Sequence, residues 1–157
     1  MSGPELPPAA EIVPHAGAMV LLSRVLHHEE NRTVCAVDID AQSMFRDRAG
    51  DVAAWVGIEY MAQCIAAHAG LIGRASETPP QVGFLIGSRR IDFHAPSFRR
   101  GQTLEVTARR VWGGAEGLVS FSCTLRDAST RTLLAEGRLN CFTPAAGDAS
   151  TGSGDPS

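Results

Sequence analysis

The chain has 157 residues, a length typical of one domain, with 44% hydrophobic and 20% charged residues. Its net charge of −3 argues against a nucleic-acid binder, since such proteins normally carry a basic balance. All 14 basic residues are arginine, which excludes Schiff-base lysine catalysis and P-loop lysine chemistry. No apolar run approaches the roughly 20 residues of a membrane span, and the N-terminus lacks a signal-peptide pattern, so we expect a cytoplasmic protein.

Both ends of the chain are poor in large apolar residues. Residues 1–9 are rich in proline and alanine, and residues 144–157 are rich in glycine, serine and proline. We expect both ends to be disordered, because neither buries enough apolar surface to offset the entropy of ordering. This leaves a single domain over residues 10–143. The four cysteines form no CxxC pair and do not cluster with histidine, so we expect buried free thiols.

The predicted elements begin with two strands, at Ala18–His27 and Arg32–Asp40. A helix is predicted over Val52–Arg74, which is rich in alanine and lacks proline, with Asp51 as N-cap and Gly73 as C-terminal stop. Most of its positions are apolar, which predicts burial on more than one side. Four strands follow, three of them with alternating polar and apolar residues: Gln81–Ala95, Gln102–Trp112, Leu118–Asp127 and Thr132–Phe142. This order predicts an α+β hotdog architecture, in which a mostly antiparallel sheet of five or six strands wraps one long helix.

Three stretches resemble one enzyme family. Val13–Val25, with its Pro-His pair, is similar to the opening strand of the FabZ-type 3-hydroxyacyl-acyl-carrier-protein dehydratases, although Ser23 replaces the aspartate of their Asp-Arg-Val triplet. Ile58–Gln63 (IEYMAQ) resembles their helix motif of an apolar residue, glutamate, two further residues, alanine and glutamine. Arg90–Leu104 resembles their strand with phenylalanine and basic residues. The sequence motifs PHxGxM and WVGIEYMAQ most resemble those of the ApeP-type dehydratases of aryl polyene biosynthesis.

The resemblance implies an activity and partners. The expected reaction converts a 3-hydroxyacyl group on acyl carrier protein to the trans-2-enoyl form, in fatty-acid, polyketide or polyene biosynthesis, without a metal or organic cofactor. It implies a homodimer or a heterodimer with a second hotdog subunit, and no nucleic-acid or membrane partner. Two alternatives remain: a non-catalytic subunit that pairs with an active dehydratase, and a hotdog acyl thioesterase.

The sequence departs from the family at one catalytic position. FabZ-type enzymes carry a His-Phe-Pro-Gly motif about fourteen residues before the helix glutamate, and its histidine is the second catalytic residue. Here that position is Phe45, and no histidine lies between His28 and His68. The family's Met-Pro-Gly at the helix entrance is also replaced, by Ala53-Ala54-Trp55.

Dehydration needs one group that removes a proton next to the carbonyl and another that protonates the leaving hydroxyl. Glu59 is the predicted acid, because its apolar surroundings disfavour a charged carboxylate. His15 is the predicted base, since imidazole titrates near neutral pH. His94 or a histidine from a partner subunit is the alternative. A purely structural role for Glu59 or His15 also remains open.

The remaining predicted residues support this pair. Gln63 lies one turn after Glu59 and either positions its carboxyl group or contacts a partner subunit. At the helix entrance, backbone N–H groups are suited to the thioester oxygen, and Trp55 narrows the acyl channel or stacks on an unsaturated chain. His68 is expected in the core, and His27 and His28 at a solvated hairpin end. Five residues are predicted to line the substrate site, three of them at the helix entrance: Ala54, Trp55 and Gly57, together with Gln63 and His94. Four arginines are expected either to dock the acidic carrier protein or to be solvated strand ends: Arg89, Arg90, Arg99 and Arg100.

Overall fold

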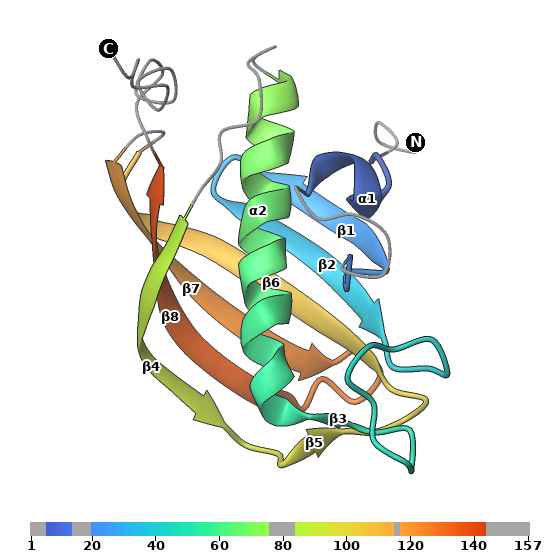
Figure 1. The fold of residues 1–157 in the computed structure, drawn as a ribbon. Helices are drawn as coiled ribbons and strands as arrows, with labels where there is room; N and C mark the ends of the chain where they lie inside the picture. Colours follow the sequence, from blue (N-terminus) through green and yellow to red (C-terminus); the bar gives the residue numbers. More distant parts are fainter. Residues whose placement is uncertain (1–5, 14–19, 76–83, 115–116, 144–157) are drawn as a thin grey trace, which may run out of the picture.

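A long helix, α2, lies across one face of a curved antiparallel sheet, as Figure 1 shows. The computed structural model describes residues 6–13, 20–75, 84–114 and 117–143. Within these ranges the strands of the main sheet follow the order β1-β2-β6-β7-β8-β4, and every neighbouring pair is antiparallel. The elements are α1 (Ala9–Ile12), β1 (Arg24–Glu29), β2 (Arg32–Asp38), β3 (Val52–Ala53), α2 (Gly57–Ala75), β4 (Phe84–Phe93), β5 (Ser97–Phe98), β6 (Thr103–Trp112), β7 (Gly117–Asp127) and β8 (Leu133–Thr143). The predicted α+β hotdog architecture is confirmed.

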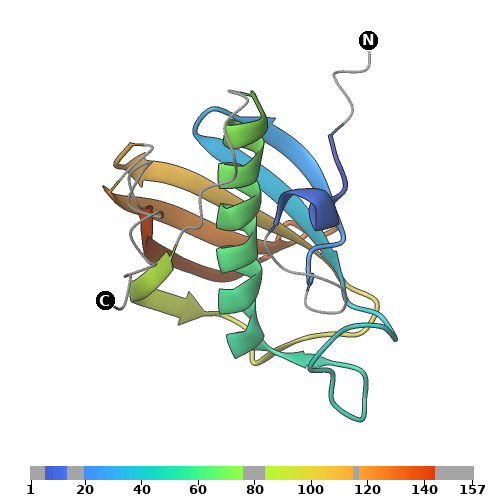
Figure 2. The ribbon, with the colours of Figure 1, turned by 45° about the horizontal axis from the view of Figure 1, so that its top comes forward.

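The alternation in the late strands sorts their side chains between two faces. In β7, Val119, Phe121, Cys123 and Leu125 face α2 and are buried. The intervening Ser122 and Thr124 are more exposed and lie on the outer face, as expected for a sheet with one covered side, whereas Ser120 is also buried. The second view in Figure 2 shows the same layers, with α2 running along the inner face of the sheet. No helix in the described part of the chain is long and apolar enough to cross a membrane.

The start of the helix differs from the prediction. Val52 and Ala53 pair with β5, and a 3₁₀ turn over Ala54–Val56 precedes α2, which begins at Gly57 rather than Val52. Asp51 is not an N-cap, because its Oδ1 accepts the Arg100 N–H at 2.9 Å. The local sequence favours a helix here, but pairing with a segment more than forty residues away holds the backbone extended.

Three other predicted boundaries need correction. The first strand begins at Arg24, not Ala18; of the earlier residues, 18 and 19 lie outside the described part of the chain. The helix continues through Gly73 to Ala75, so Gly73 is not its stop. Ala9, which we assigned to a disordered N-terminus, is 3% exposed and belongs to α1. Residues 1–5 and 144–157, whose predicted disorder stays a prediction, lie outside the described residues.

Two glycines let α2 approach its neighbours closely. A Cβ atom on Gly57 would lie 2.6 Å from Leu125 Cδ1 and 3.1 Å from Phe98 Cζ. A Cβ atom on Gly70 would collide with the Ile12 carbonyl oxygen of α1. The helix is therefore fixed against the sheet at its start and against α1 further along. The four cysteines are buried and free, as predicted.

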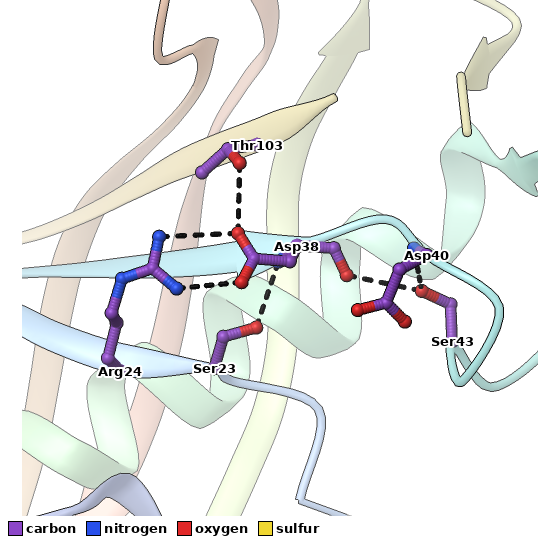
Figure 3. A network of polar contacts seen from close by, with 6 residues as sticks. All are labelled: Ser23, Arg24, Asp38, Asp40, Ser43 and Thr103. Carbon is purple, nitrogen blue, oxygen red and sulfur yellow. Dashed lines mark hydrogen bonds and ion pairs between the residues drawn. The ribbon is translucent and has the colours of Figure 1, made fainter. Parts of the chain in front are cut away.

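A polar network joins β1, β2 and β6 at the point where β2 ends (Figure 3). Asp38 accepts hydrogen bonds from Arg24 Nη1 at 2.7 Å, Arg24 Nη2 at 3.3 Å and Thr103 Oγ1 at 2.9 Å. The Arg24 hydrogen bonds, opposed by partial burial, lower the pKa of Asp38. Ser23 Oγ, at the position of the family's aspartate, accepts the Asp38 N–H at 2.9 Å.

The network continues into the loop that follows β2. Ser43 Oγ donates to the Asp38 carbonyl at 3.2 Å and accepts the Asp40 N–H at 2.9 Å. Ser43 thus holds the first turn of the 40–51 loop against the end of β2. Through this turn, the network fixes where the loop begins its path toward the start of α2.

A buried chain of side chains crosses the core near the middle of α2. Thr33 Oγ1 lies 2.7 Å from His68 Nδ1 and 2.8 Å from His28 Nδ1. His68 is 3% exposed, which confirms its predicted core position. Burial, together with the nearby His28 and Arg110, lowers the pKa of His68 to about 4. His28 is part of this hydrogen-bonded group of side chains and is half-buried. His27 and His28 were both predicted at a solvated hairpin end, and only His27 is exposed there.

We predict that acid weakens the fold through His68. The pKa of His68 is about 4 in the fold and 6.5 without the fold's influence, so the unfolded chain takes up a proton first as pH falls. The free energy of unfolding should be highest above pH 6.5 and should fall by on the order of 3 kcal/mol between pH 6.5 and pH 4. Urea titrations across this range should show the fall in the native chain and a flatter profile in His68→Gln. A matched His27→Gln variant should keep the native profile; an unchanged slope in His68→Gln would refute the assignment.

Candidate active site

The Glu59 carboxyl group lies in the first turn of α2 and is half-buried. Its Oε1 accepts a hydrogen bond from Gln63 Nε2 at 3.3 Å. The spacing of four residues places both side chains on the same face of the helix, as the sequence indicated. The predicted contact between the glutamine and the carboxyl group is therefore present.

The orientation of the Gln63 amide is fixed from its other end. Gln63 is fully buried, and its Oε1 accepts the backbone N–H of Leu21 at 2.8 Å. Because a backbone N–H only donates, the amide oxygen must face Leu21, and the NH₂ group must face Glu59. Gln63 thus links the strand entry at Leu21 to the Glu59 carboxyl group through one rigid amide.

Two exposed aromatic rings stand at the entrance to α2. Trp55 is 63% exposed and Phe45 is 51% exposed, and their ring centroids are 6.2 Å apart. Phe45 is the residue at the position of the missing family histidine. It adopts a φ of 65°, a left-handed conformation that costs a non-glycine residue roughly 1–2 kcal/mol. An aromatic pair therefore occupies the place where the family motif would supply an imidazole.

The helix entrance offers one backbone donor at the predicted place. The Ala54 N–H donates to the Pro96 carbonyl at 3.0 Å, so it is not available to a thioester oxygen. The Trp55 N–H has no backbone partner among the described residues, and it becomes the candidate donor. Gly57 is buried against Leu125 and Phe98, so the bare side of its Cα faces the core. Gly57 was predicted to line the substrate site, and the structure shows that it allows α2 to pack closely on the sheet.

The predicted base, His15, lies outside the described residues, in the segment 14–19. The chain on both sides of this segment is anchored on α2. Ile12 lies against Gly70, and the Leu21 N–H is bound by Gln63. These anchor points are seven helix residues apart, about 10 Å along the axis.

The other histidines are not joined to Glu59 by any contact among the described residues. His94 is about half exposed, and its Nε2 lies 3.7 Å from Glu136 Oε1. Its backbone N–H donates to the Leu134 carbonyl. Glu136 belongs to β8, on the outer face of the sheet. His68 lies nine residues beyond Glu59 and is bonded to Thr33. Among the predicted site residues whose side chains the structure describes, Glu59 is in contact with Gln63, and neither His94 nor His68 is joined to it.

The predicted arginines separate into two places. Arg90, in β4, is exposed and forms an ion pair with Asp92 at 2.9 Å. Arg99 and Arg100 lie in the turn between β5 and β6, and both are exposed. The side chain of Arg89 is outside the described part of the structure.

A cavity of about 160 Å³ lies beside Tyr60 and Leu21. Burial raises the pKa of the Tyr60 hydroxyl to about 12, so it stays protonated. Asp38, Asp40 and Ser43, which belong to the polar network of Figure 3, supply its polar wall. Glu59 is not among its described lining residues, so this cavity belongs to the network rather than to the carboxyl group.

Comparison with known proteins gives a family and a fold. A family model described as ApeP-like, ApeP dehydratase, matches residues 7–152. No curated protein sequence matches the chain significantly. The dehydratase heterocomplex ApeI:P from Xenorhabdus doucetiae contains a similar chain, with 28% identity and a TM-score of 0.82 over 89% of this chain and 93% of that chain.

More distant structures share the fold. Zebrafish thioesterase superfamily member 2 is 16% identical, with a TM-score of 0.62 over 86% of this chain and 91% of that chain. The PaaI protein of E. coli is 15% identical, with a TM-score of 0.59 over 75% of this chain and 80% of that chain. At these identities the likeness shows the hotdog fold and nothing of the reaction.

We predict that Gln63 contributes to stability as well as to the site. Gln63→Met keeps the volume but leaves the Leu21 N–H without its side-chain acceptor, which should lower the free energy of unfolding by about 1–3 kcal/mol. Urea denaturation of the variant measures this loss. The exposed Gln42→Met is the matched control and should change stability by less than about 0.5 kcal/mol. Equal effects in the two variants would show that the Leu21 contact contributes nothing.

Proposed function

We propose, from the premise that this chain belongs to the ApeP-like dehydratase family, that it dehydrates 3-hydroxyacyl thioesters carried on acyl carrier protein. The product would be the trans-2-enoyl thioester, and the family points to polyene, fatty-acid or polyketide biosynthesis as its setting. The observation that carries the proposal is the Glu59–Gln63–Leu21 arrangement: a half-buried carboxyl group held by an amide whose orientation is itself fixed. We place the protein in the cytoplasm, where acyl carrier proteins act.

The reaction needs two proton transfers at neighbouring carbons. A base removes a proton from the carbon next to the thioester carbonyl, and the electron pair forms the new double bond. The hydroxyl group on the next carbon leaves with a proton from an acid, as water. We assign the acid to Glu59. The Trp55 N–H, at the entrance of α2, is the candidate donor to the carbonyl oxygen, on which negative charge develops.

We assign the base to His15. Residue 15 follows Ile12 by three positions, and Ile12 is anchored on α2 at Gly70. Extended chain spans about 3.3 Å per residue, so His15 is within reach of the helix face between Gly70 and Glu59. His94 is a weaker candidate because its imidazole lies beside Glu136 on the outer face.

Pairing with a second hotdog subunit is part of the proposal. The ApeI:P neighbour is a dehydratase heterocomplex. In this chain, β4 is the last strand of the sheet order, and its described residues pair on one side only, with β8. A long edge strand presents unpaired N–H and C=O groups on which a strand of another chain can pair, so β4 is our candidate edge for a partner subunit. The partner would be either a second copy or a different hotdog chain.

A non-catalytic role is the second candidate. The observation that favours it is Phe45, which stands with Trp55 where the family histidine belongs. In this case the subunit would shape the site of an active partner, and its own Glu59 would not turn over substrate. Activity of the purified chain alone separates the two.

We predict that Glu59→Gln abolishes dehydration while the fold is kept. Glutamine is nearly isosteric but transfers no proton, so turnover of a 3-hydroxyacyl carrier-protein substrate should fall on the order of a hundredfold or more. Formation of the enoyl thioester, followed by absorbance or mass spectrometry, is the measurement. Glu30→Gln, in the exposed β1–β2 hairpin, is the control and should keep full turnover. Native-like turnover in Glu59→Gln would make Glu59 a structural residue.

We also predict that His15 acts with Glu59 as one unit. His15→Ala should reduce turnover about as severely as Glu59→Gln, and the double variant should be little worse than either one, because paired catalytic groups do not contribute additively. The imidazole should lie within about 4–8 Å of the Glu59 carboxyl group, with room for substrate between them. An experimental structure that places His15 far from Glu59 in both subunits of a dimer would overturn this pair and favour the non-catalytic role.

A further inference from the structure

We infer that four arginines, Arg46, Arg48, Arg99 and Arg100, form the docking surface for the acidic carrier protein that delivers the substrate. This arginine surface rests on the proposed function, which makes a carrier protein the substrate carrier. It differs from the expectation based on sequence in two ways. It adds two arginines from the loop after β2. It also leaves out both predicted arginines of β4: Arg90, which is paired with Asp92, and Arg89, whose side chain lies outside the described part of the structure.

The arginines come from two loops that the fold holds side by side. In Figures 1 and 2 the loop between β2 and β3 and the turn between β5 and β6 lie next to each other, beyond the start of α2. The pairing of Val52 with Phe98 joins the bases of the two loops. The Arg100 N–H binds Asp51 Oδ1 at 2.9 Å, and the Arg100 side chain packs over Gly50.

The loop that carries Arg46 and Arg48 is held by its own backbone. Asp47 Oδ1 accepts the N–H groups of Ala49 at 2.9 Å and Asp51 at 3.0 Å, and the Asp47 N–H donates to the Asp51 carbonyl at 2.7 Å. The two aspartates of this loop thus accept hydrogen bonds from main-chain N–H groups rather than from arginine side chains. The two loops present their guanidinium groups on an ordered support.

The four side chains are exposed, and within the described residues none of them forms an ion pair. Five arginines elsewhere in the fold are paired with carboxylates, namely Arg24, Arg32, Arg74, Arg90 and Arg131. Four others, in strands of the main sheet, also form no ion pair with a described residue: Arg109, Arg110, Arg126 and Arg138. The absence of an ion pair therefore does not by itself single out the arginine surface, which is distinguished by its place at the entrance to α2. Residues 46–51 and 99–100 hold four arginines and two aspartates, a surplus of two positive charges, in a chain whose net charge is −3. A local positive surplus favours a negatively charged partner and repels the same surface of another copy.

The position of this surface matches delivery of a thioester to Glu59. Trp55 and Phe45 stand beside the arginines, and Glu59 follows Trp55 by four residues, about one helical turn. A carrier protein seated on the arginines would therefore have the aromatic pair between itself and the carboxyl group. The exposed rings supply apolar contact area next to the charged arginines, and protein interfaces commonly combine apolar and charged groups in this way.

The test is direct binding of a purified acidic acyl carrier protein loaded with a 3-hydroxyoctanoyl thioester. The test variant is Arg48→Glu combined with Arg100→Glu. The control is Arg109→Glu combined with Arg138→Glu, two exposed arginines on the outer face of the sheet that flank Ser122 in register. Both variants change the net charge equally. At low salt the test variant should bind the carrier at least roughly tenfold more weakly, and the control should bind it within about twofold of the native chain.

Two further readouts separate docking from catalysis. The ratio of kcat/KM for the carrier-bound substrate to that for the N-acetylcysteamine thioester should fall about tenfold in the test variant, since the small thioester needs no docking. The milder Arg48→Gln with Arg100→Gln should give an intermediate loss, and added salt should remove the difference between variants. Equal losses in the test and control variants, or no carrier binding by the native chain, would overturn the arginine surface. Arginine-dependent carrier binding without turnover of either thioester would keep the surface and refute the catalytic proposal.

Discussion

The close contact between the start of α2 and the sheet is the constraint on which the site depends. Gly57 leaves no room for a side chain between the helix, Leu125 and Phe98, so the helix axis is fixed at this point. Glu59 is only two residues further on, and its depth in the protein follows directly from that contact. A helix held further from the sheet would expose Glu59 more and would separate Gln63 from the Leu21 N–H. The packing of one glycine thus sets the surroundings of the carboxyl group.

The fold could be predicted where the sequence pattern reports local burial. The alternation in β6 and β7 gave their bounds to within a residue at most ends, because a sheet with one covered face forces every second side chain inward. The same reasoning failed at Val52. Its neighbours are good helix formers, and the residues that keep it extended, Ser97 and Phe98, are more than forty positions away. A contact of this kind leaves no trace in a window of local sequence.

In the site, too, contacts between residues close in sequence could be predicted, whereas contacts between residues far apart in sequence could not. The contact of Glu59 with Gln63 follows from helical spacing and was predicted. The bond from Leu21 to Gln63 joins residues 42 positions apart and was not. Arg46 and Arg48 were not among the predicted docking residues for a related reason. They precede the helix by several residues, in a segment whose sequence is typical of a polar loop. Only the β3–β5 pairing brings them to Arg99 and Arg100. The absence of the family histidine at Phe45, in contrast, was visible in the sequence alone.

The replacement at Phe45 changes what the loop after β2 contributes. In the FabZ-type pattern this loop supplies a catalytic histidine, whereas here it supplies an exposed aromatic ring and two arginines. The loop is nevertheless held by hydrogen bonds of Ser43 at its start and of Asp47 near its end. Phe45 also carries the cost of a left-handed backbone. An ordered loop that bears a strained, exposed aromatic residue is better explained by recognition than by proton transfer. Recognition at the mouth of the site and chemistry on α2 would then be separate tasks, and the base would come from another segment or another subunit.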